Sequence, residues 1–487
     1  MRRALLTPLV LLVTGTLLIA SCAEASTDDI SLTFEGDEGF QAEEDLDDEI
    51  DERIAPDTGL EGGEAPTSDQ VVEAALLDVD AFWSRSYEDL YGEPYEPIEG
   101  GFWAYGPDSA QPPCGDPPPG YADIAQNAFY CPSADLIAWD NVNLVPGLYE
   151  EFGGFTLGIV FAHEFGHAIQ TKSDTEGPTI ILELQADCFA GAWTADVADG
   201  GSDYFELTLQ DLDKAVAGFL ELRDGVGTAA EDPAAHGTGF DRIGAFVDGF
   251  EQGAERCLAY PEEGASGELV VVEVPFTSED DFQRGGNLPL DELGPLLLTD
   301  LENFWTLLFE EQGRTWTPVT DVVLLDPSVD EVECGGDTYS GDVLVNASFY
   351  CVDSDVIYLD GVNLVPTLNE IGDYAVATEI ARQYAFAAQV RLGVLDNTVG
   401  TNLQADCLAG LYAFSGFAGN REGQGQELFL SPGDLDEAVI AFLLNSDASE
   451  DVEAGDVSVG TAFQRFDAYR AGFLQGTEAC DALLEEG

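Results

Sequence analysis

Hydrophobic residues lie along the chain in segments whose patterns predict a protein with both helices and strands. Residues 155–171 are mostly apolar and contain no proline, which is typical of a buried helix. Residues 180–195 and 239–258 are predicted to form two more helices. Residues 128–140 carry aromatic and other β-favouring side chains beside turn-forming residues, which indicates a strand. We therefore expect an α+β fold that is mainly helical, with a small β-sheet.

The sequence also contains an internal duplication. Five groups of residues occur twice in the same order, with matching positions about 220 residues apart, and chance does not produce such a series. They are Phe82-Trp83 with Phe304-Trp305, Phe129-Tyr130-Cys131 with Phe349-Tyr350-Cys351, Asn143-Leu144-Val145-Pro146 with Asn363-Leu364-Val365-Pro366, Leu184-Gln185-Ala186-Asp187-Cys188 with Leu403-Gln404-Ala405-Asp406-Cys407, and Gly237-Thr238 with Gly460-Thr461. We therefore predict two homologous domains, at residues 71–257 and 293–487, joined by a linker at residues 258–292.

The N-terminus has the pattern of an export signal. Arg2 and Arg3 precede an apolar run over residues 4–20, which is short for a membrane span and typical of a signal peptide. The run ends in residues 18–22, Leu-Ile-Ala-Ser-Cys, which resemble the lipobox of bacterial lipoproteins. That resemblance implies cleavage before Cys22, lipid attachment to its sulfur, and anchoring to the outer face of the bacterial membrane. A plain signal peptide followed by a chance cysteine is the alternative.

The chain is extremely acidic. It has 95 Asp and Glu against 16 Lys and Arg, a formal net charge of −79. Such a surface repels nucleic acid and anionic lipid, so neither is an expected partner, and only the lipid anchor would connect the protein to a membrane. Residues 23–70 are acidic and poor in aromatic residues, which predicts a disordered tether. A solvated surface suited to a saline habitat explains the acidity more simply than an acidic docking face.

Beyond Cys22 the number of cysteines is even, and each repeat contains four of them. An even number in an exported chain favours disulfides. Four cysteines allow three pairings in each domain, and proximity along matching elements favours one of them. The favoured pairs are Cys114 with Cys131, Cys188 with Cys257, Cys334 with Cys351, and Cys407 with Cys480.

The first long apolar segment contains the sequence His163-Glu164-Phe165-Gly166-His167. Two His residues four positions apart lie on one face of a helix, where both imidazoles can reach one Zn²⁺. Glu164 lies one step round the helix, near enough to act on a water molecule at the metal. The alternative is a buried helix with two core His residues, which is costly because two His and a Glu would be buried without a partner.

Three motifs in order resemble those of the bacterial putative neutral zinc metallopeptidases: His-Glu-x-x-His, then Glu183-Leu-Gln-Ala-Asp-Cys-Phe-Ala-Gly191, then His236-Gly-Thr. The resemblance covers roughly residues 71–257 and implies a zincin-like fold that hydrolyses peptide bonds. Similarity to gluzincin-type peptidases implies that Glu183 is the third zinc ligand and that Asp187 hydrogen-bonds a ligand His. The reverse assignment, with Asp187 as the ligand and Glu183 outside, is also open, because either carboxylate can coordinate zinc.

The expected chemistry is zinc-dependent hydrolysis of a peptide or protein substrate. Zn²⁺ would activate a water molecule, and Glu164 would take its proton and pass it to the leaving amine. His236 either donates a hydrogen bond to the oxyanion or only packs at the start of the last helix. The substrate is expected to lie extended along the strand near residues 136–139, by main-chain pairing.

The second repeat lacks the residues that bind the metal in the first. Alignment without gaps puts Arg382 at the position of His163, Gln383 at Glu164 and Phe386 at His167. Glu183 becomes Asn402, while Asp187 is retained as Asp406. We therefore expect one zinc ion per chain, and a second domain that is structural or binds substrate or a partner protein.

A non-catalytic function is the principal alternative. In that hypothesis the chain is a cell-surface binding lipoprotein whose first domain holds zinc structurally. A closed structural site needs four protein ligands, and the sequence near the motif offers no further His and no unpaired Cys. An open coordination position is typical of catalytic zinc, so the enzyme is the favoured interpretation.

Overall fold

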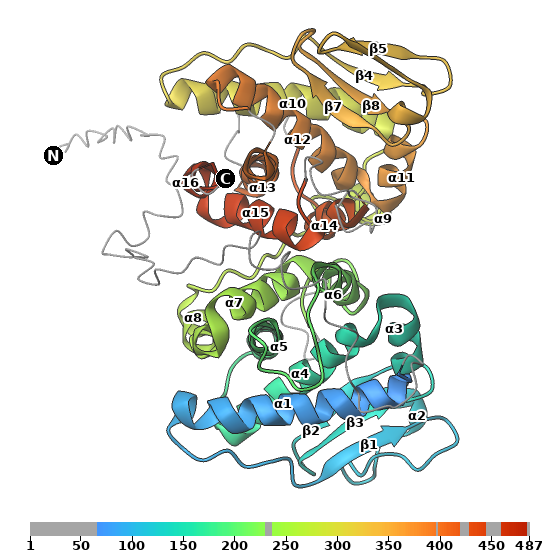
Figure 1. Cartoon of the computed structure of the whole chain (residues 1–487), viewed down its shortest axis with the longest axis vertical. Helices are drawn as coiled ribbons and strands as arrows, with labels where there is room; N and C mark the ends of the chain where they lie inside the picture. Colours follow the sequence, from blue (N-terminus) through green and yellow to red (C-terminus); the bar gives the residue numbers. More distant parts are fainter. Residues whose placement is uncertain (1–65, 229–235, 396–397, 419–427, 445–458, 485–487) are drawn as a thin grey trace, which may run out of the picture. The chain divides into compact units, whose positions relative to one another are not determined.

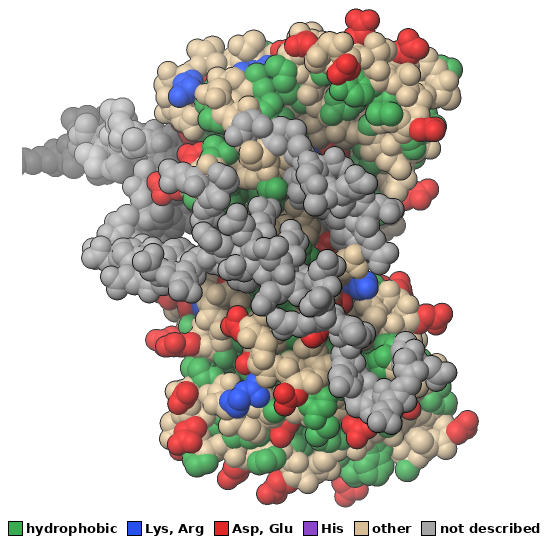
Figure 2. Space-filling view, in the orientation of Figure 1, with side chains coloured by type: hydrophobic (Ala, Val, Ile, Leu, Met, Phe, Trp, Pro, Cys, Tyr) green, Lys and Arg blue, Asp and Glu red, His purple; other side chains and the backbone are tan. Residues whose placement is uncertain are grey.

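A computed structural model describes residues 66–228, 236–395, 398–418, 428–444 and 459–484 (Figure 1). The predicted signal peptide, Cys22 and nearly all of the predicted tether lie outside these residues, so lipidation stays a prediction. No helix in the described part of the chain is long and apolar enough to cross a membrane. Figure 2 shows Asp and Glu side chains scattered over the visible face with few Lys or Arg between them.

The first repeat is mainly helical and contains one small sheet. Strand β1 is parallel to β3, β2 is antiparallel to β3, and the order across the sheet is β1-β3-β2. The elements in chain order are α1 (Ser68–Tyr91), β1 (Gly101–Tyr105), α2 (Tyr121–Ile124), β2 (Ala128–Cys131), β3 (Leu136–Asp140), α3 (Leu144–Phe152), α4 (Gly154–Lys172), α5 (Thr179–Ala198), α6 (Leu209–Glu221) and α7 (Gly239–Cys257).

Several predicted elements have different bounds. The predicted strand at 128–140 is a hairpin of β2 and β3, because residues 132–135 form a turn in which Asp135 has a φ of 46°. Helix α1 begins at Ser68, inside the predicted tether, because Thr67 and Gln70 form a reciprocal capping box there. Helices α4, α5 and α7 lie where the apolar pattern predicts them, within a few residues at each end.

Glycines allow the three central helices of this repeat to approach closely. A Cβ on Gly166 of α4 would lie 2.8 Å from the Cα of Ala186 in α5. Between α5 and α7, a Cβ on Gly191 would lie 1.9 Å from the carbonyl oxygen of Phe246, and Gly249 is equally tight. Real Cβ atoms do not approach so closely, so any side chain at Gly166 would push α5 away from α4.

The second repeat has the same order of elements. Its sheet has the order β4-β8-β7, again with one parallel and one antiparallel pair, and a separate hairpin of β5 and β6 is added. The elements are α10 (Leu290–Glu311), β4 (Asp321–Leu325), β5 (Glu331–Cys334), β6 (Asp337–Ser340), β7 (Ser348–Cys351), β8 (Val356–Asp360), α11 (Leu364–Ile371), α12 (Asp373–Leu392), α13 (Val399–Ala418), α14 (Asp434–Leu444), α15 (Ala462–Gln475) and α16 (Thr477–Ala482).

The segment predicted as a linker, residues 258–292, is partly helical. It contains α8 (Tyr260–Ser266) and α9 (Glu279–Gln283), and α10 already begins at Leu290. Helix α8 packs on α5 of the first repeat, and the Tyr260 hydroxyl donates a hydrogen bond to Asp248. This part of the predicted linker is therefore an extension of the first repeat.

Four disulfides are present, and they join the pairs favoured by the sequence: Cys114–Cys131, Cys188–Cys257, Cys334–Cys351 and Cys407–Cys480. In each repeat one bond joins a loop or strand to the edge strand of the sheet. The other ties the helix that follows the metal-motif position to the chain near the end of the repeat. The prediction of a mainly helical α+β chain with two disulfide-bonded repeats is confirmed.

The two repeats contact each other through α6 and α7 of the first and α14 and α15 of the second. The contacts are reciprocal. Asp213 of α6 accepts a hydrogen bond from Phe463 N at the start of α15, and Asp436 of α14 accepts one from Phe240 N at the start of α7. Each repeat thus supplies a carboxylate to the first turn of a helix in the other repeat. The carboxylate accepts a hydrogen bond from a free N–H group and interacts favourably with the helix dipole.

Candidate metal centre

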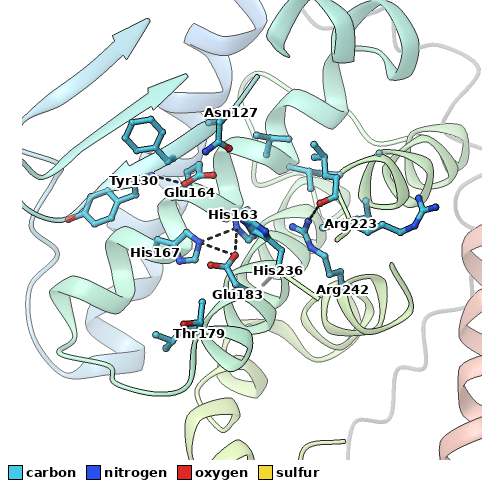
Figure 3. Close-up of a pocket in the computed structure, with 18 of the residues that line it drawn as sticks. Asn127, Tyr130, His163, Glu164, His167, Thr179, Glu183, Arg223, His236 and Arg242 are labelled. Carbon is cyan, nitrogen blue, oxygen red and sulfur yellow. Dashed lines mark hydrogen bonds and ion pairs between the residues drawn. The ribbon is translucent and has the colours of Figure 1, made fainter. Parts of the chain in front are cut away.

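Helices α4 and α5 bring three potential metal ligands together (Figure 3). His163 Nε2 and His167 Nε2 are 3.1 Å apart. Glu183 Oε2 is 3.3 Å from His163 Nε2 and 3.4 Å from His167 Nε2. Ligand atoms at zinc bonding distances occupy tetrahedron corners about 3.3 Å apart, so this triangle has the size that Zn²⁺ requires.

The outer nitrogen of each imidazole faces an oxygen atom. His163 Nδ1 lies 2.7 Å from Asp187 Oδ1, and His167 Nδ1 lies 3.0 Å from Gln170 Oε1. The Gln170 amide is held in this orientation because its Nε2 donates to Leu182 O and to Gln185. In a neutral imidazole only one nitrogen carries a proton, and here it is Nδ1. When both imidazoles are neutral, their Nε2 atoms therefore direct lone pairs at the same point.

Glu183 Oε2 is directed at the same point as these lone pairs. It is buried and has no hydrogen-bond partner. Three acceptor atoms that face one another inside a protein repel each other unless a cation lies between them. The donor set of two imidazoles and one carboxylate is typical of catalytic zinc, so the residues fit this metal.

Asp187 lies outside the ligand set but is essential to its geometry. It is fully buried and also accepts hydrogen bonds from Arg242 Nε and Nη2, each at 2.9 Å. Burial raises the pKa of Asp187, but Arg242 and then His163 outweigh burial and hold the pKa below its usual range. Asp187 therefore stays ionised and orients His163, in the position expected from the family resemblance.

The field in the centre favours positive charge. Burial lowers the pKa of His163, but Asp187, Glu183 and Glu164 outweigh it and raise this pKa to about 10. The pKa of Glu183 is likewise held well below its usual range by the two imidazoles, against the effect of burial. A site that raises the pKa of a base and lowers that of an acid stabilises a cation.

The centre lies in a cavity of about 680 Å³. His163, Glu164, His167 and Glu183 line it together with residues 126–130, which include the first three residues of β2. The opposite wall comes from α6 and the start of α7. A small peptide segment fits a cavity of this size.

A model of the family described as putative neutral zinc metallopeptidase matches residues 55–259 and 286–483, most of the chain, in two regions that correspond to the two repeats. This chain belongs to that family. The predicted resemblance to this family is confirmed.

Several relatives are uncharacterized proteins. Uncharacterized protein YpfJ of Escherichia coli K12 is 29% identical over an alignment of 150 residues, which covers 26% of this chain and 50% of that protein. Uncharacterized protein Rv2575 of Mycobacterium tuberculosis is 28% identical over an alignment of 161 residues, which covers 28% of this chain and 55% of that protein. The chain thus spans about half the length of the curated relatives it matches. No solved structure matches it.

Glu164 faces the cavity beside the three candidate metal ligands (Figure 3). Its Oε2 accepts a hydrogen bond from Tyr130 N at 2.7 Å. The Tyr130 N–H therefore points toward α4 and not toward the neighbouring strand. This contact fixes the carboxylate between the metal ligands and the edge of the sheet, so Glu164 stands where a base for a bound water would act.

The predicted substrate strand is wrong. Strand β3, which contains residues 136–139, is the central strand, and its main-chain groups pair with both β1 and β2. It therefore has no free edge for a peptide. Strand β2 lies at the edge of the sheet and lines the cavity, so it is the strand that can pair with an extended chain.

His236 lines the same cavity, and its side chain is 48% exposed. Asp224 holds this segment, because its Oδ2 accepts from the N–H groups of His236 and Gly237, and its Oδ1 lies 3.4 Å from His236 Nδ1. The sequence analysis missed Asp224, because no motif spacing connects it to His236. The geometry allows His236 to reach a substrate in the cavity.

In the second repeat an arginine takes the place of the metal ligands. The Arg382 Nε lies 2.8 Å from Asp406 Oδ1, and its guanidinium stacks on the ring of Phe386 with 4.9 Å to the centroid. It also donates to Asn402 Oδ1 at 3.0 Å. Arg382, Phe386 and Asn402 stand where His163, His167 and Glu183 stand in the first repeat. The site is filled by a guanidinium, which cannot bind a metal cation.

Proposed function

We propose that this chain is an exported zinc peptidase whose first repeat hydrolyses peptide bonds, while the second repeat binds no catalytic zinc. One observation carries the proposal. The Nε2 atoms of His163 and His167 and the unpartnered Oε2 of Glu183 converge within 3.4 Å at the wall of a cavity. A bound Zn²⁺ would supply a Lewis acid that activates water and polarises a carbonyl group.

The side chains around the centre have separate functions in the rest of the reaction. Glu164 accepts the proton of the attacking water and delivers it to the leaving amine, which it can do from its position between the ligands and β2. His236, which also lines the cavity, donates a hydrogen bond to the developing oxyanion. Asp187 holds His163 in the tautomer that leaves Nε2 free for the metal.

The substrate is an extended peptide segment that pairs with the outer edge of β2. Residues 126–130 line the cavity beside the ligands, so a strand added there passes the centre. The ionised side chains at the cavity include Arg223 and Arg242, but Arg242 is engaged by Asp187 and Arg223 by Asp436. Main-chain pairing is therefore the principal contribution to binding.

A structural zinc in a binding lipoprotein is the second hypothesis. A closed site needs a fourth protein ligand, and among the described residues only His163, His167 and Glu183 form the group at this position. The three ligands also lie at a cavity large enough for a substrate. Both features favour an open, catalytic coordination sphere.

The lipid anchor is part of the same proposal and rests on residues 18–22 alone. Labelling with a radioactive fatty acid should mark the wild-type chain and not Cys22→Ser. Equal labelling of the two chains would exclude the anchor and would leave the peptidase proposal unaffected.

The decisive experiment compares wild type with Glu164→Gln, by metal content and by cleavage of a denatured protein. We expect about one zinc ion per chain in both, but cleavage in wild type only, because Gln cannot accept the proton. Glu176→Gln, which removes an exposed charge elsewhere in the repeat, is the matched control and should cleave normally. Zinc binding without cleavage in any variant or wild type would favour the binding lipoprotein.

A further inference from the structure

Three buried carboxylates meet in the second repeat, away from the catalytic centre. Asp373 is the first residue of α12, and Asp434 and Glu437 lie in the first turn of α14. Their exposed fractions are only 4%, 3% and 7%. Each offers one oxygen to a group of three in which all oxygens lie within 4.8 Å of one another. Burial of three such groups together is costly unless something compensates their charge.

One oxygen of each carboxylate has a structural hydrogen bond. Asp373 Oδ2 accepts from Leu288 N at 2.8 Å, Asp434 Oδ2 from Ser431 N at 2.7 Å, and Glu437 Oε2 from Tyr374 N at 2.9 Å. The second oxygen of each aspartate makes no such contact. Asp373 Oδ1 and Asp434 Oδ1 are buried and have no hydrogen-bond partner. These hydrogen bonds account for one oxygen of each aspartate and leave the other oxygen without a partner.

The surroundings add negative charge. After burial itself, the charged groups that act most strongly on the pKa of Asp434 are Glu437, Asp373 and Asp281, and all three raise it. Burial and then Asp373 raise the pKa of Glu437 to about 8, and burial with Asp281 raises that of Asp373 to about 6. Arginine and lysine are absent from these dominant influences. The cluster therefore attracts positive charge from solution.

The first repeat shows that the fold does not need this cluster. There, the Asp211 carboxylate accepts a hydrogen bond from Thr208 N, as the Asp434 carboxylate accepts one from Ser431 N in the second repeat. The alignment puts Gly154 at Asp373 and the exposed Lys214 at Glu437. Two of the three carboxylates are thus additions of the second repeat, on a framework that folds without them.

The backbone beside the cluster is shaped for a carboxylate. A Cβ on Gly372 would lie 1.9 Å from the carboxyl carbon of Glu437. At the corresponding Gly153 of the first repeat, a Cβ would meet nothing within 4 Å. The Glu437 carboxyl group therefore packs against the start of α12, in space that only a glycine at position 372 leaves open.

We propose that Asp373, Asp434 and Glu437 bind one calcium ion in the second repeat. The donors are all oxygens, which excludes the nitrogen- and sulfur-rich environment that zinc favours. Ca²⁺ accepts irregular cages of carboxylate and backbone oxygens, whereas Mg²⁺ demands a regular octahedron and retains waters that a buried site accommodates poorly. The ion gives the unpartnered Asp373 Oδ1 and Asp434 Oδ1 a partner.

Calcium would tie the starts of α12 and α14 together. Helix α14 also carries Asp436, which accepts a hydrogen bond from Phe240 N and pairs with Arg223 at 3.1 Å in the first repeat. Binding would therefore stabilise the contact between the repeats. This proposal is independent of the peptidase activity.

The test is a calorimetric titration of the zinc-loaded whole chain with CaCl₂ in about 1 M NaCl, where the Debye length is ~3 Å and exposed acidic groups are screened. We expect one saturable site and a rise in the unfolding temperature with calcium. Glu437→Lys, which installs the residue of the first repeat, should weaken binding more than about 100-fold and remove the calcium dependence of unfolding, because a ligand becomes a cation. Asp434→Asn should weaken it as well.

Asp211→Asn is the matched control, because it alters the same capping position in the first repeat, and it should bind calcium like wild type. If Glu437→Lys does not fold, Glu437→Gln keeps the size of the side chain and provides the same measurement. The proposal fails if wild type shows no saturable site, if the cluster variants bind as wild type does, or if magnesium at equal concentration displaces calcium fully.

Discussion

The two repeats keep the same surroundings for a central position but fill it differently. In the first, Asp187 lies between Arg242 and His163. In the second, Asp406 lies between Arg465 and Arg382. A fully buried aspartate thus has a permanent arginine on one side in both. On the other side the first repeat has an imidazole that can hold a metal, and the second has a second guanidinium.

The comparison shows that each repeat places a second basic group against the buried aspartate, an imidazole in the first and a guanidinium in the second. A trace of the metal-binding form persists in the second repeat. Gln389 donates to Thr401 O and Gln404, as Gln170 does to Leu182 O and Gln185. Its Oε1 is buried without a partner, because Phe386 offers no N–H where His167 does. The amide is thus oriented for a histidine that the second repeat lacks.

Replacing His163 of the first repeat with the arginine found at that position in the second repeat should have the largest effect. His163→Arg is expected to reduce zinc from about one ion per chain to none and to abolish cleavage. The protein should still fold, because Arg382 shows that the framework accommodates a guanidinium beside the aspartate. Metal analysis and circular dichroism check this, and retained zinc would break the equivalence of the two positions.

The reciprocal change should create a second zinc site. The four substitutions Arg382→His, Gln383→Glu, Phe386→His and Asn402→Glu, made together, are expected to raise the zinc content to about two per chain. The supporting Asp406 and Gln389 are already in place. A zinc content that stays at one would mean that α12 and α13 are spaced differently from α4 and α5.

Removing the Arg382 guanidinium should destabilise the second repeat without changing the zinc content of the chain. Arg382→Met leaves Asp406 paired with Arg465 alone, and the loss of one charged hydrogen-bond partner is expected to cost about 2 kcal/mol of unfolding free energy. Denaturant unfolding measures this. The control Arg284→Met breaks only exposed pairs and should cost less than ~1 kcal/mol. Equal effects would show that the guanidinium is not structurally important.

Weakening the support of the first centre should reduce zinc affinity and leave the second repeat unchanged. Asp187→Asn is expected to lower zinc affinity about 10- to 100-fold, because the amide holds the His163 tautomer less firmly. Competition with a chromophoric chelator gives the affinity. A variant that binds zinc like wild type would reassign Asp187 to a purely structural function through Arg242.

Zinc binding by the first repeat should depend on pH. In the metal-free protein the pKa of His163 is about 10, above its ordinary value of 6.5, so the folded state binds this proton more tightly than the unfolded chain. The resulting stabilisation is complete below about pH 6.5 and is lost as the pH rises through 10. Zinc must displace this proton, so its apparent affinity should rise roughly tenfold per pH unit between pH 7 and 9. A flat profile would contradict the raised pKa.

The sequence by itself determined the duplication, the mainly helical α+β class and the identity of the residues at the centre. Periodicity identifies α4, α5 and α7 because each is long and apolar, and the spacing of His163 and His167 depends only on the pitch of one helix. The loss of the ligands in the second repeat is likewise visible in the aligned residues. These features are local, or depend on a comparison of the chain with itself.

Only the tertiary structure decided features that depend on contacts between distant segments. Strand order excluded residues 136–139 as the substrate strand, because β3 is central and β2 is at the edge. Packing brought Asp224 to His236, and Asp373 to Asp434 and Glu437, although no local pattern in the sequence predicts these contacts. Close packing at Gly166 likewise set how near α5 brings Glu183 to the two histidines. Such distances follow from how side chains fill the space between elements, and the spacing of residues along the sequence does not predict them.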